Sequence, residues 1–159
     1  MELLQGANEK ADRFSCIIAT VFWALVVIFA IVACAMTIPV LRYYVMGPTF
    51  LITMGAALFL LGMALIWLTL KARVTGALKK FLILTGASAA GFPVSVLLHN
   101  AFYGLGIMAE HITVLRYLME VLHIAFFILA IFVCPLGFLT GAVGSVALFI
   151  QKGKRSRFS

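Results

Sequence analysis

Charged residues divide the chain into four long apolar stretches. The stretches predict membrane helices at 14–37, 49–70, 81–105 and 107–150, and we expect the last to cross the membrane with residues 126–150. Each apolar part reaches or exceeds the roughly 20 residues that a helix needs to span a bilayer. The pattern therefore predicts an all-α integral membrane protein folded as a four-helix bundle.

The segments outside the predicted membrane domain, residues 14–150, are polar. Residues 1–13 carry mixed charge and are expected to form a short cytoplasmic tail, and the basic residues 151–159 are expected to be a disordered cytoplasmic tail. Between the first two spans, Gly47-Pro48 predicts a turn with proline at the first position of the next helix, where its missing N–H costs no hydrogen bond.

Lysine and arginine are distributed unequally between the two sides of the predicted bundle. Ten lie in the terminal tails and in the loop 71–80, whereas the other side has only Arg42 and Arg116. An excess of cations in short loops marks the cytoplasmic side of a membrane protein. We therefore expect both termini to be cytoplasmic and the last helix to extend on the outer side. The tyrosines also fall near that outer interface: Tyr43, Tyr44, Tyr103 and Tyr117.

The composition agrees with a lipid environment. The chain is 65% hydrophobic and has a mean hydropathy of +1.19, more apolar surface than a soluble domain of this length could bury. The net charge of +7 does not indicate nucleic-acid binding, because the cations lie at the ends of spans rather than on one face. We expect Cys16, Cys34 and Cys134, which lie within apolar stretches, to be small buried hydrophobes.

Two stripes of small residues at intervals of four lie in the third and fourth spans: Ala87, Gly91 and Ser95, and Gly137, Gly141 and Ser145. In lipid, helices associate largely through small residues that let their backbones approach. We therefore predict that these spans are the closest helix pair and touch through Gly91 and Gly141. Pro93 and Pro135 should bend the same spans, either as hinges or as ordinary membrane-helix kinks.

Polar residues gather in the outer half of the last two spans: His99, Asn100, Arg116, Glu120 and His123. At about 100° per residue, Arg116, Glu120 and His123 share a helix face with Gly137 and Gly141. The pattern predicts a wet outer vestibule above the glycine contact, with an Arg116–Glu120 pair one helical turn apart.

Three other interpretations of these residues are weighed against the vestibule. Glu120-x-x-His123 has the spacing of a metal-ligand pair, but carboxylate-bridged sites need two such motifs and further acids, so no metal is predicted. A haem between His99 and His123 is disfavoured, because counting from Lys80 and Lys152 places the two residues about 28 and 43 Å up their helices. The polar stripe could also be the solvated face of an interfacial helix.

Motifs for covalent or phosphate chemistry are missing from the sequence. It has no nucleophile–base pair, phosphate-cradling glycine loop or dinucleotide fingerprint, so we expect neither enzymatic activity nor a cofactor. The leading hypothesis is a non-catalytic structural or accessory subunit that self-associates or joins a larger membrane complex. The alternatives are a small transporter or channel with an outward vestibule, and a haem- or metal-binding membrane subunit.

The stretches LKKFLILTGASAAGFPVSVLLHNAFYGLG and FFILAIFVCPLGFLTGAVGSVALFI resemble small four-span bacterial membrane proteins with no assigned activity. The resemblance covers about the last half of the chain and depends on membrane-helix sequence rather than on a chemical motif. It implies a multi-pass protein of the bacterial plasma membrane. It implies no cofactor, activity or site residue.

Overall fold

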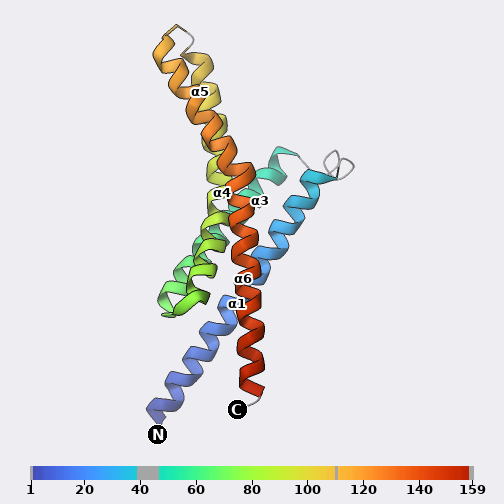
Figure 1. Ribbon diagram of the computed structural model, residues 1–159, viewed down its shortest axis with the longest axis vertical. Helices are drawn as coiled ribbons and strands as arrows, with labels where there is room; N and C mark the ends of the chain where they lie inside the picture. Colours follow the sequence, from blue (N-terminus) through green and yellow to red (C-terminus); the bar gives the residue numbers. More distant parts are fainter. Residues whose placement is uncertain (1, 39–46, 110, 158–159) are drawn as a thin grey trace.

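The computed structural model describes residues 2–38, 47–109 and 111–157, and within these ranges it contains helices and no strand (Figure 1). The elements in chain order are α1 (Glu2–Thr37), α3 (Pro48–Lys71), α4 (Gly76–Met108), α5 (Thr113–Ile128), the π-helical turn η1 (Leu129–Val133) and α6 (Cys134–Arg157). Of these, α5, η1 and α6 follow one another without a break.

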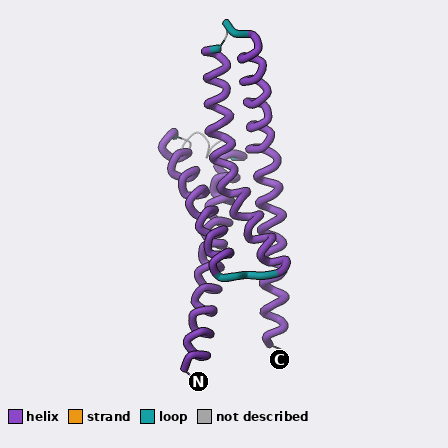
Figure 2. Tube along the Cα trace, turned by 90° about the vertical axis from the view of Figure 1, so that its left-hand side faces the viewer, coloured by secondary structure: helices purple, strands orange, loops and turns teal. Residues whose placement is uncertain are grey.

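Four helical stretches are long and apolar enough to cross a membrane, as the sequence predicts: 13–35, 49–71, 76–108 and 113–151. They run alternately up and down, so that both termini lie at the same end of the molecule (Figures 1 and 2). The fourth stretch, 113–151, is the longest because it combines α5, η1 and most of α6.

The helices extend beyond the predicted spans. The tail predicted at 1–13 is helical from Glu2, and the tail expected to be disordered after residue 150 continues as α6 to Arg157. Once a span has formed, each added residue gains a backbone hydrogen bond without a new nucleation step, so polar tails can continue the helix. Arg42, Tyr43 and Tyr44 lie outside the described residues.

The start of α3 confirms the expected turn. Gly47 is the N-cap and Pro48 is the first helical residue. At the other end of α3 the ammonium group of Lys71 lies 4.4 Å from the ring centroid of Trp67 and 5.9 Å from that of Phe14 on α1. Such cation–π contacts suit a boundary between apolar and aqueous surroundings.

The packing of α3 against α4 centres on two glycines. A Cβ atom at Gly62 would lie 2.6 Å from the carbonyl oxygen of Gly86, and one at Gly86 would lie 2.8 Å from the carbonyl oxygen of Gly62. Neither position has room for a side chain, so the two backbones are in direct contact. This pair was not predicted from the sequence, and it puts the backbones of α3 and α4 in direct contact, as Gly141 does for α6 and α4.

The packing of α6 against α4 uses a different register from the predicted one. A Cβ atom at Gly141 would lie 2.7 Å from the backbone nitrogen of Thr85, and one at Gly137 would meet the hydroxyl of Ser88. Gly91 instead faces the Cys134 sulfur, at 3.4 Å from a Cβ atom. The predicted helix pair is therefore in contact, but Gly91 and Gly141 do not face each other.

The predicted small-residue stripe on α4 is wrong at its first position, since Ala87 is exposed, whereas Ser95 is buried. Residues spaced by four advance about 40° around a helix at each step, so a long stripe leaves the contact face. The residues of α4 that face α6 are instead Phe81, Thr85, Ser88 and Gly91, at spacings of four, three and three. On α6, Ser145 is fully buried, and its hydroxyl has no hydrogen-bond partner among the described residues.

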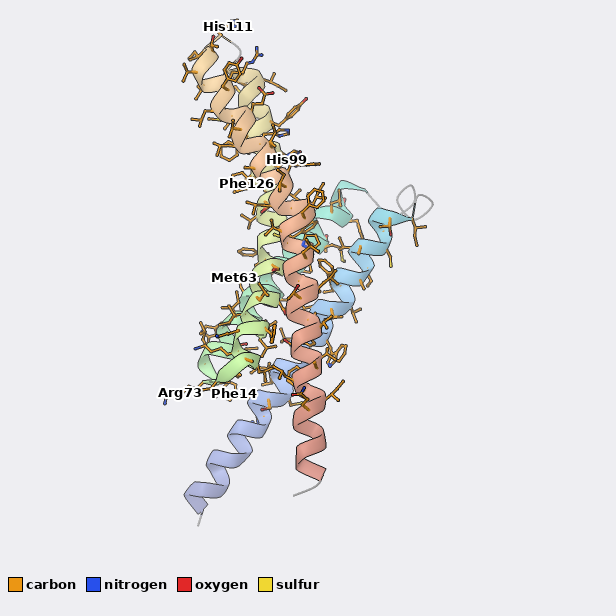
Figure 3. All side chains as sticks on the ribbon, in the orientation of Figure 1. Phe14, Met63, Arg73, His99, His111 and Phe126 are labelled. Atoms are coloured by element: carbon orange, nitrogen blue, oxygen red, sulfur yellow. The ribbon has the colours of Figure 1, made fainter. Side chains whose placement is uncertain are left out.

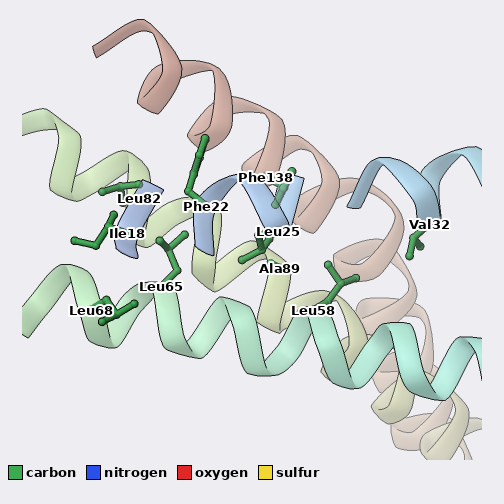
Figure 4. Packing of buried hydrophobic residues seen from close by; sticks show 10 residues of the cluster. All are labelled: Ile18, Phe22, Leu25, Val32, Leu58, Leu65, Leu68, Leu82, Ala89 and Phe138. Carbon is green, nitrogen blue, oxygen red and sulfur yellow. The ribbon is translucent and has the colours of Figure 1, made fainter. Parts of the chain in front are cut away.

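Side-chain packing rather than glycine contact attaches α1. A cluster of buried apolar residues joins α1 to the other helices (Figure 4): Ile18, Phe22, Leu25, Val32, Leu58, Leu65, Leu68, Leu82, Ala89 and Phe138. The ring of Phe29 stacks on that of Phe138 at 3.9 Å between centroids. Aromatic rings therefore bridge α1 and α6.

The turn η1 lies immediately before Pro135. Within it the N–H of Cys134 bonds to the carbonyl of Leu129, five residues earlier. A proline ring collides with the carbonyl four residues before it in a regular helix, and a widened turn relieves the collision. Above this turn α5 leans away from the axis of α6 (Figure 1). Pro93, in contrast, lies within α4 without interrupting it.

The upper part of the molecule is a two-helix hairpin, which we call the arm: residues 97–108 of α4 and the whole of α5. It projects past the ends of α1 and α3, at the end opposite both termini (Figures 1 and 2). The remaining helical region is called the body. The residues singled out for candidate chemistry all lie in the arm.

Candidate functional site

The structure brings His99 and His123 together at the base of the arm, where Figure 3 labels His99. Their rings stack with centroids 4.1 Å apart and an angle of 23° between planes. Tyr103 packs on His123, and Phe127 packs on His99, each at 5.2 Å between centroids. The four rings form one column, in the order Tyr103, His123, His99, Phe127, which joins α4 to α5.

The two histidines also exchange hydrogen bonds with each other's backbone. Nδ1 of His99 lies 3.1 Å from the carbonyl oxygen of His123, and Nδ1 of His123 lies 3.3 Å from that of His99. A carbonyl oxygen only accepts hydrogen bonds, so each Nδ1 must carry the proton. In a neutral ring that donates through Nδ1, Nε2 is the nitrogen with the free lone pair.

The contact between the two histidines corrects the depth estimate from the sequence. The ring of Phe81 lies directly against Gly144, so these two residues are level. From that level His99 lies about 27 Å and His123 about 32 Å along its helix. The earlier estimate assumed that Lys80 and Lys152 are level, whereas α6 extends past the start of α4.

The geometry does not fit a haem held between these residues. Two axial histidines present their ring edges to an iron from opposite faces of a porphyrin, whereas these rings stack face to face at 4.1 Å and leave no space between them. Across the described parts of the chain there is also no group of three or more His, Cys, Asp or Glu side chains able to hold a metal ion.

A cleft of about 450 Å³ opens between α4 and α5 above the histidine pair. Its lining combines aromatic, apolar and charged side chains: Phe102, Tyr103, Gly106, Ile107, Arg116, Met119, Glu120 and His123. His99 lies behind His123 in the ring column. Asn100 does not line the cleft, because it is exposed and its side-chain amide donates to the carbonyl of Val96 at 2.8 Å.

The predicted ion pair between Arg116 and Glu120 is not formed. Both side chains are exposed, and among the described residues no salt bridge joins them. An exposed ion pair stabilises a protein by at most about 1 kcal/mol, and forming it costs the conformational entropy of two long side chains. The absence of this pair is therefore physically reasonable. The cleft therefore has a cation and an anion one helical turn apart that do not neutralise each other directly.

Sequence reasoning missed the aromatic part of the site. Phe102 stacks on Phe126 at 5.5 Å, beside the histidine column. Gly106 lies where the two helices are close, since a Cβ atom there would be 3.5 Å from that of Met119. The available signal was the spacing of four between rings in both segments, His99 with Tyr103 and His123 with Phe127.

A second hollow, of about 660 Å³, lies between α1 and α6 in the body. Phe29 and Phe138 form part of it, and the remaining lining is aliphatic except for Cys34. It has no charged group and no cluster of hydrogen-bonding side chains. Its lining suits hydrocarbon, so the arm cleft is the better candidate for recognition of a polar group.

No protein-family model matches the chain, and neither does any curated protein or solved structure. The function is therefore inferred from the residues and their geometry.

Proposed function

We propose that the protein is a non-catalytic accessory subunit of a membrane that self-associates through its arm. The observation that supports this most strongly is an apolar stripe on α5, which we call the back face: Val114, Tyr117, Leu118, Val121, Ile124 and Ile128. At about 100° per residue these positions centre on the side opposite His123, away from the cleft. All are exposed, with Val114 at 81% and Val121 at 63%.

The height of the outer part of this stripe, Val114, Tyr117 and Leu118, favours a protein partner over lipid. We place one edge of the hydrocarbon core at Phe81, because Lys79 and Lys80 precede it. A core of about 30 Å then ends near His99, whereas Val114 lies about 45 Å along its helix from Gly144. Apolar side chains beyond the lipid would contact water, and covering them stabilises the protein by about 25 cal/mol for each Å² buried.

A second copy of this chain is the partner that the back face fits. The stripe contains no charged residue, so it is complementary to another apolar surface. A twofold axis would place the same stripe of two arms against itself, which is the commonest arrangement of homo-oligomers. We further propose, from the cation distribution and the resemblance to bacterial four-span proteins, a bacterial plasma membrane with both termini cytoplasmic.

The alternative of a transporter is less well supported by the body. The arm cleft lies above the point where Gly141 meets Thr85 and Gly137 meets Ser88. At these contacts the backbones of α4 and α6 are too close to leave a polar path between the two helices. A vestibule in the arm therefore has no continuation along this helix pair.

Disulfide cross-linking in lipid tests the proposal. In a chain with Cys16 and Cys34 replaced by serine and Cys134 by alanine, Val121→Cys should form cross-linked dimers in liposomes at a low protein-to-lipid ratio. Leu136→Cys is the matched control, since Leu136 is 62% exposed on the body. Equal cross-linking at both positions, or none at Val121→Cys, would contradict self-association through the arm.

A further inference from the structure

We infer that the arm cleft binds a zwitterionic group consisting of a phosphate and a primary ammonium two carbons apart, the chemistry of phosphoethanolamine. The inference goes beyond the proposed self-association and uses the opposite face of α5. The same chemistry occurs in a phosphatidylethanolamine headgroup and in the free compound, and the experiment below separates the two.

The charges of the cleft match such a group. Arg116 and Glu120 line the same cleft from positions one turn apart, where Cβ atoms are separated by about 5–6 Å. The arginine guanidinium binds phosphate oxygens with two parallel hydrogen bonds. The glutamate carboxylate accepts hydrogen bonds from an ammonium group, so a ligand with both charges would occupy the two side chains that do not pair with each other.

The remaining lining favours a primary ammonium over a quaternary one. The reciprocal hydrogen bonds leave the Nε2 lone pair of the cleft-lining His123 as an acceptor. Together with the Glu120 carboxylate it offers partners for N–H groups, which a trimethylated nitrogen lacks. The rings of Phe102 and Tyr103 add aromatic surface that attracts a cation of either kind.

The inner part of the cleft lies at the level of a headgroup. With the core placed as above, Phe102 lies about 32 Å from Phe81 along α4 and Glu120 about 36 Å from Gly144 along its helix, whereas Arg116, at about 42 Å, lies on the outer side of this level. The headgroup layer on each side of a roughly 30 Å core extends some 5–7 Å further. Next to the cleft, toward the body, the exposed ring of Phe127 on His99 offers apolar surface for the start of an acyl chain.

Native mass spectrometry of the full-length chain tests the inference. The protein is released from nanodiscs containing equal amounts of phosphatidylethanolamine and phosphatidylcholine, and the retained lipids are counted. We expect the wild type to retain the ethanolamine lipid at least about tenfold over the choline lipid, equivalent to about 1.4 kcal/mol. Glu120→Gln should abolish this preference, whereas Arg116→Gln should reduce retention of both lipids.

Matched controls separate recognition from unfolding. Lys80→Gln removes an exposed cation at the other end of α4, and Tyr117→Leu removes a ring on the back face. Both variants should retain the lipid preference, whereas Tyr103→Leu should lower the retention of both lipids. Unchanged thermal unfolding of Glu120→Gln, Arg116→Gln and Tyr103→Leu shows that each variant is folded. Equal retention of the two lipids by the wild type, or an unaltered preference in Glu120→Gln, overturns the inference.

The source of the group is resolved by adding free phosphoethanolamine to protein in phosphatidylcholine nanodiscs. An adduct that depends on Arg116 and Glu120 supports the free compound as a ligand, whereas a preference for the lipid without such an adduct supports the headgroup. Because cross-linking at Val121→Cys reports on the opposite face of α5, either proposal can fail without the other.

Discussion

The body and the arm are held together by different kinds of contact. In the body, helix backbones meet where side chains are missing, at Gly62 with Gly86 and at Gly141 with Thr85. In the arm, α4 and α5 meet through stacked rings and through hydrogen bonds exchanged by His99 and His123. Contacts of the first kind suit hydrocarbon, where burial of apolar side chains gains little and close backbones gain dispersion.

Contacts of the second kind suit the boundary with water. Each imidazole presents an apolar face to its neighbour in the stack and satisfies one polar nitrogen on a carbonyl, so the pair tolerates partial hydration. We therefore expect the body to be rigid and intolerant of added volume, and the arm to be a separable unit of lower stability.

The largest effect is expected at the contact between α3 and α4. Gly62→Leu would force a side chain into the carbonyl of Gly86, and should destabilise the protein in detergent by about 3 kcal/mol or more. Thermal unfolding followed by circular dichroism measures the change. Gly104→Leu is the control, since a Cβ atom at Gly104 in the arm meets nothing within 4 Å. Similar losses in the two variants would mean that the glycine contact does not hold the body together.

The next effect distinguishes the two glycines predicted to touch each other. Gly141→Ala should destabilise the body by about 1–3 kcal/mol, because its methyl group would meet the rigid backbone of Thr85. Gly91→Ala should be neutral or stabilising by up to about 1 kcal/mol, since it meets only the Cys134 sulfur and gains helix propensity. Chemical unfolding in detergent compares them, and a larger loss for Gly91→Ala would contradict the register of α4 against α6.

A smaller and local effect is expected in the arm. His99→Ala removes one stacked ring and one of the exchanged hydrogen bonds, which should cost about 1–2 kcal/mol. Hydrogen exchange read by mass spectrometry should speed up in residues 99–125 but not around Gly62 or Gly141. Asn100→Ala, one residue along on the exposed side, should leave exchange unchanged. Faster exchange throughout the body would show that the arm is not a separable unit.

The smallest effect on stability is expected at the junction of the two regions. Pro135→Ala removes the ring that a regular helix cannot accommodate, so η1 should revert to an α-helical turn with a change below about 1 kcal/mol. Its main consequence should be a different lean of the arm. Spin labels at Val121 and Ile52, read by pulsed electron resonance, should report a distance change of about a few ångström, and an identical distribution would exclude Pro135 as the cause of the lean.

Much of the architecture could be predicted from the sequence alone. Four apolar stretches of sufficient length specify four membrane helices, and their even number puts both termini at one end. Pro48 begins α3 at the first helical position, where its missing N–H costs no hydrogen bond. The candidate site was partly visible too, because His123, Glu120 and Arg116 recur at helical spacing on one face of α5.

Only the tertiary structure decided which residues meet and at what height. The predicted contact stripe through Ala87 and Gly91 was wrong because residues spaced by four turn gradually away from one face of a helix. The contact of Gly62 with Gly86 is one of several pairings that the small residues of α3 and α4 would permit. The stacking of His99 on His123 depends on how far along α4 the helix α6 is positioned, which places Gly144 rather than Gln151 beside Phe81. Lipid solvates every apolar register nearly equally, so the sliding position is set by close packing between particular side chains and glycines, which hydropathy does not encode.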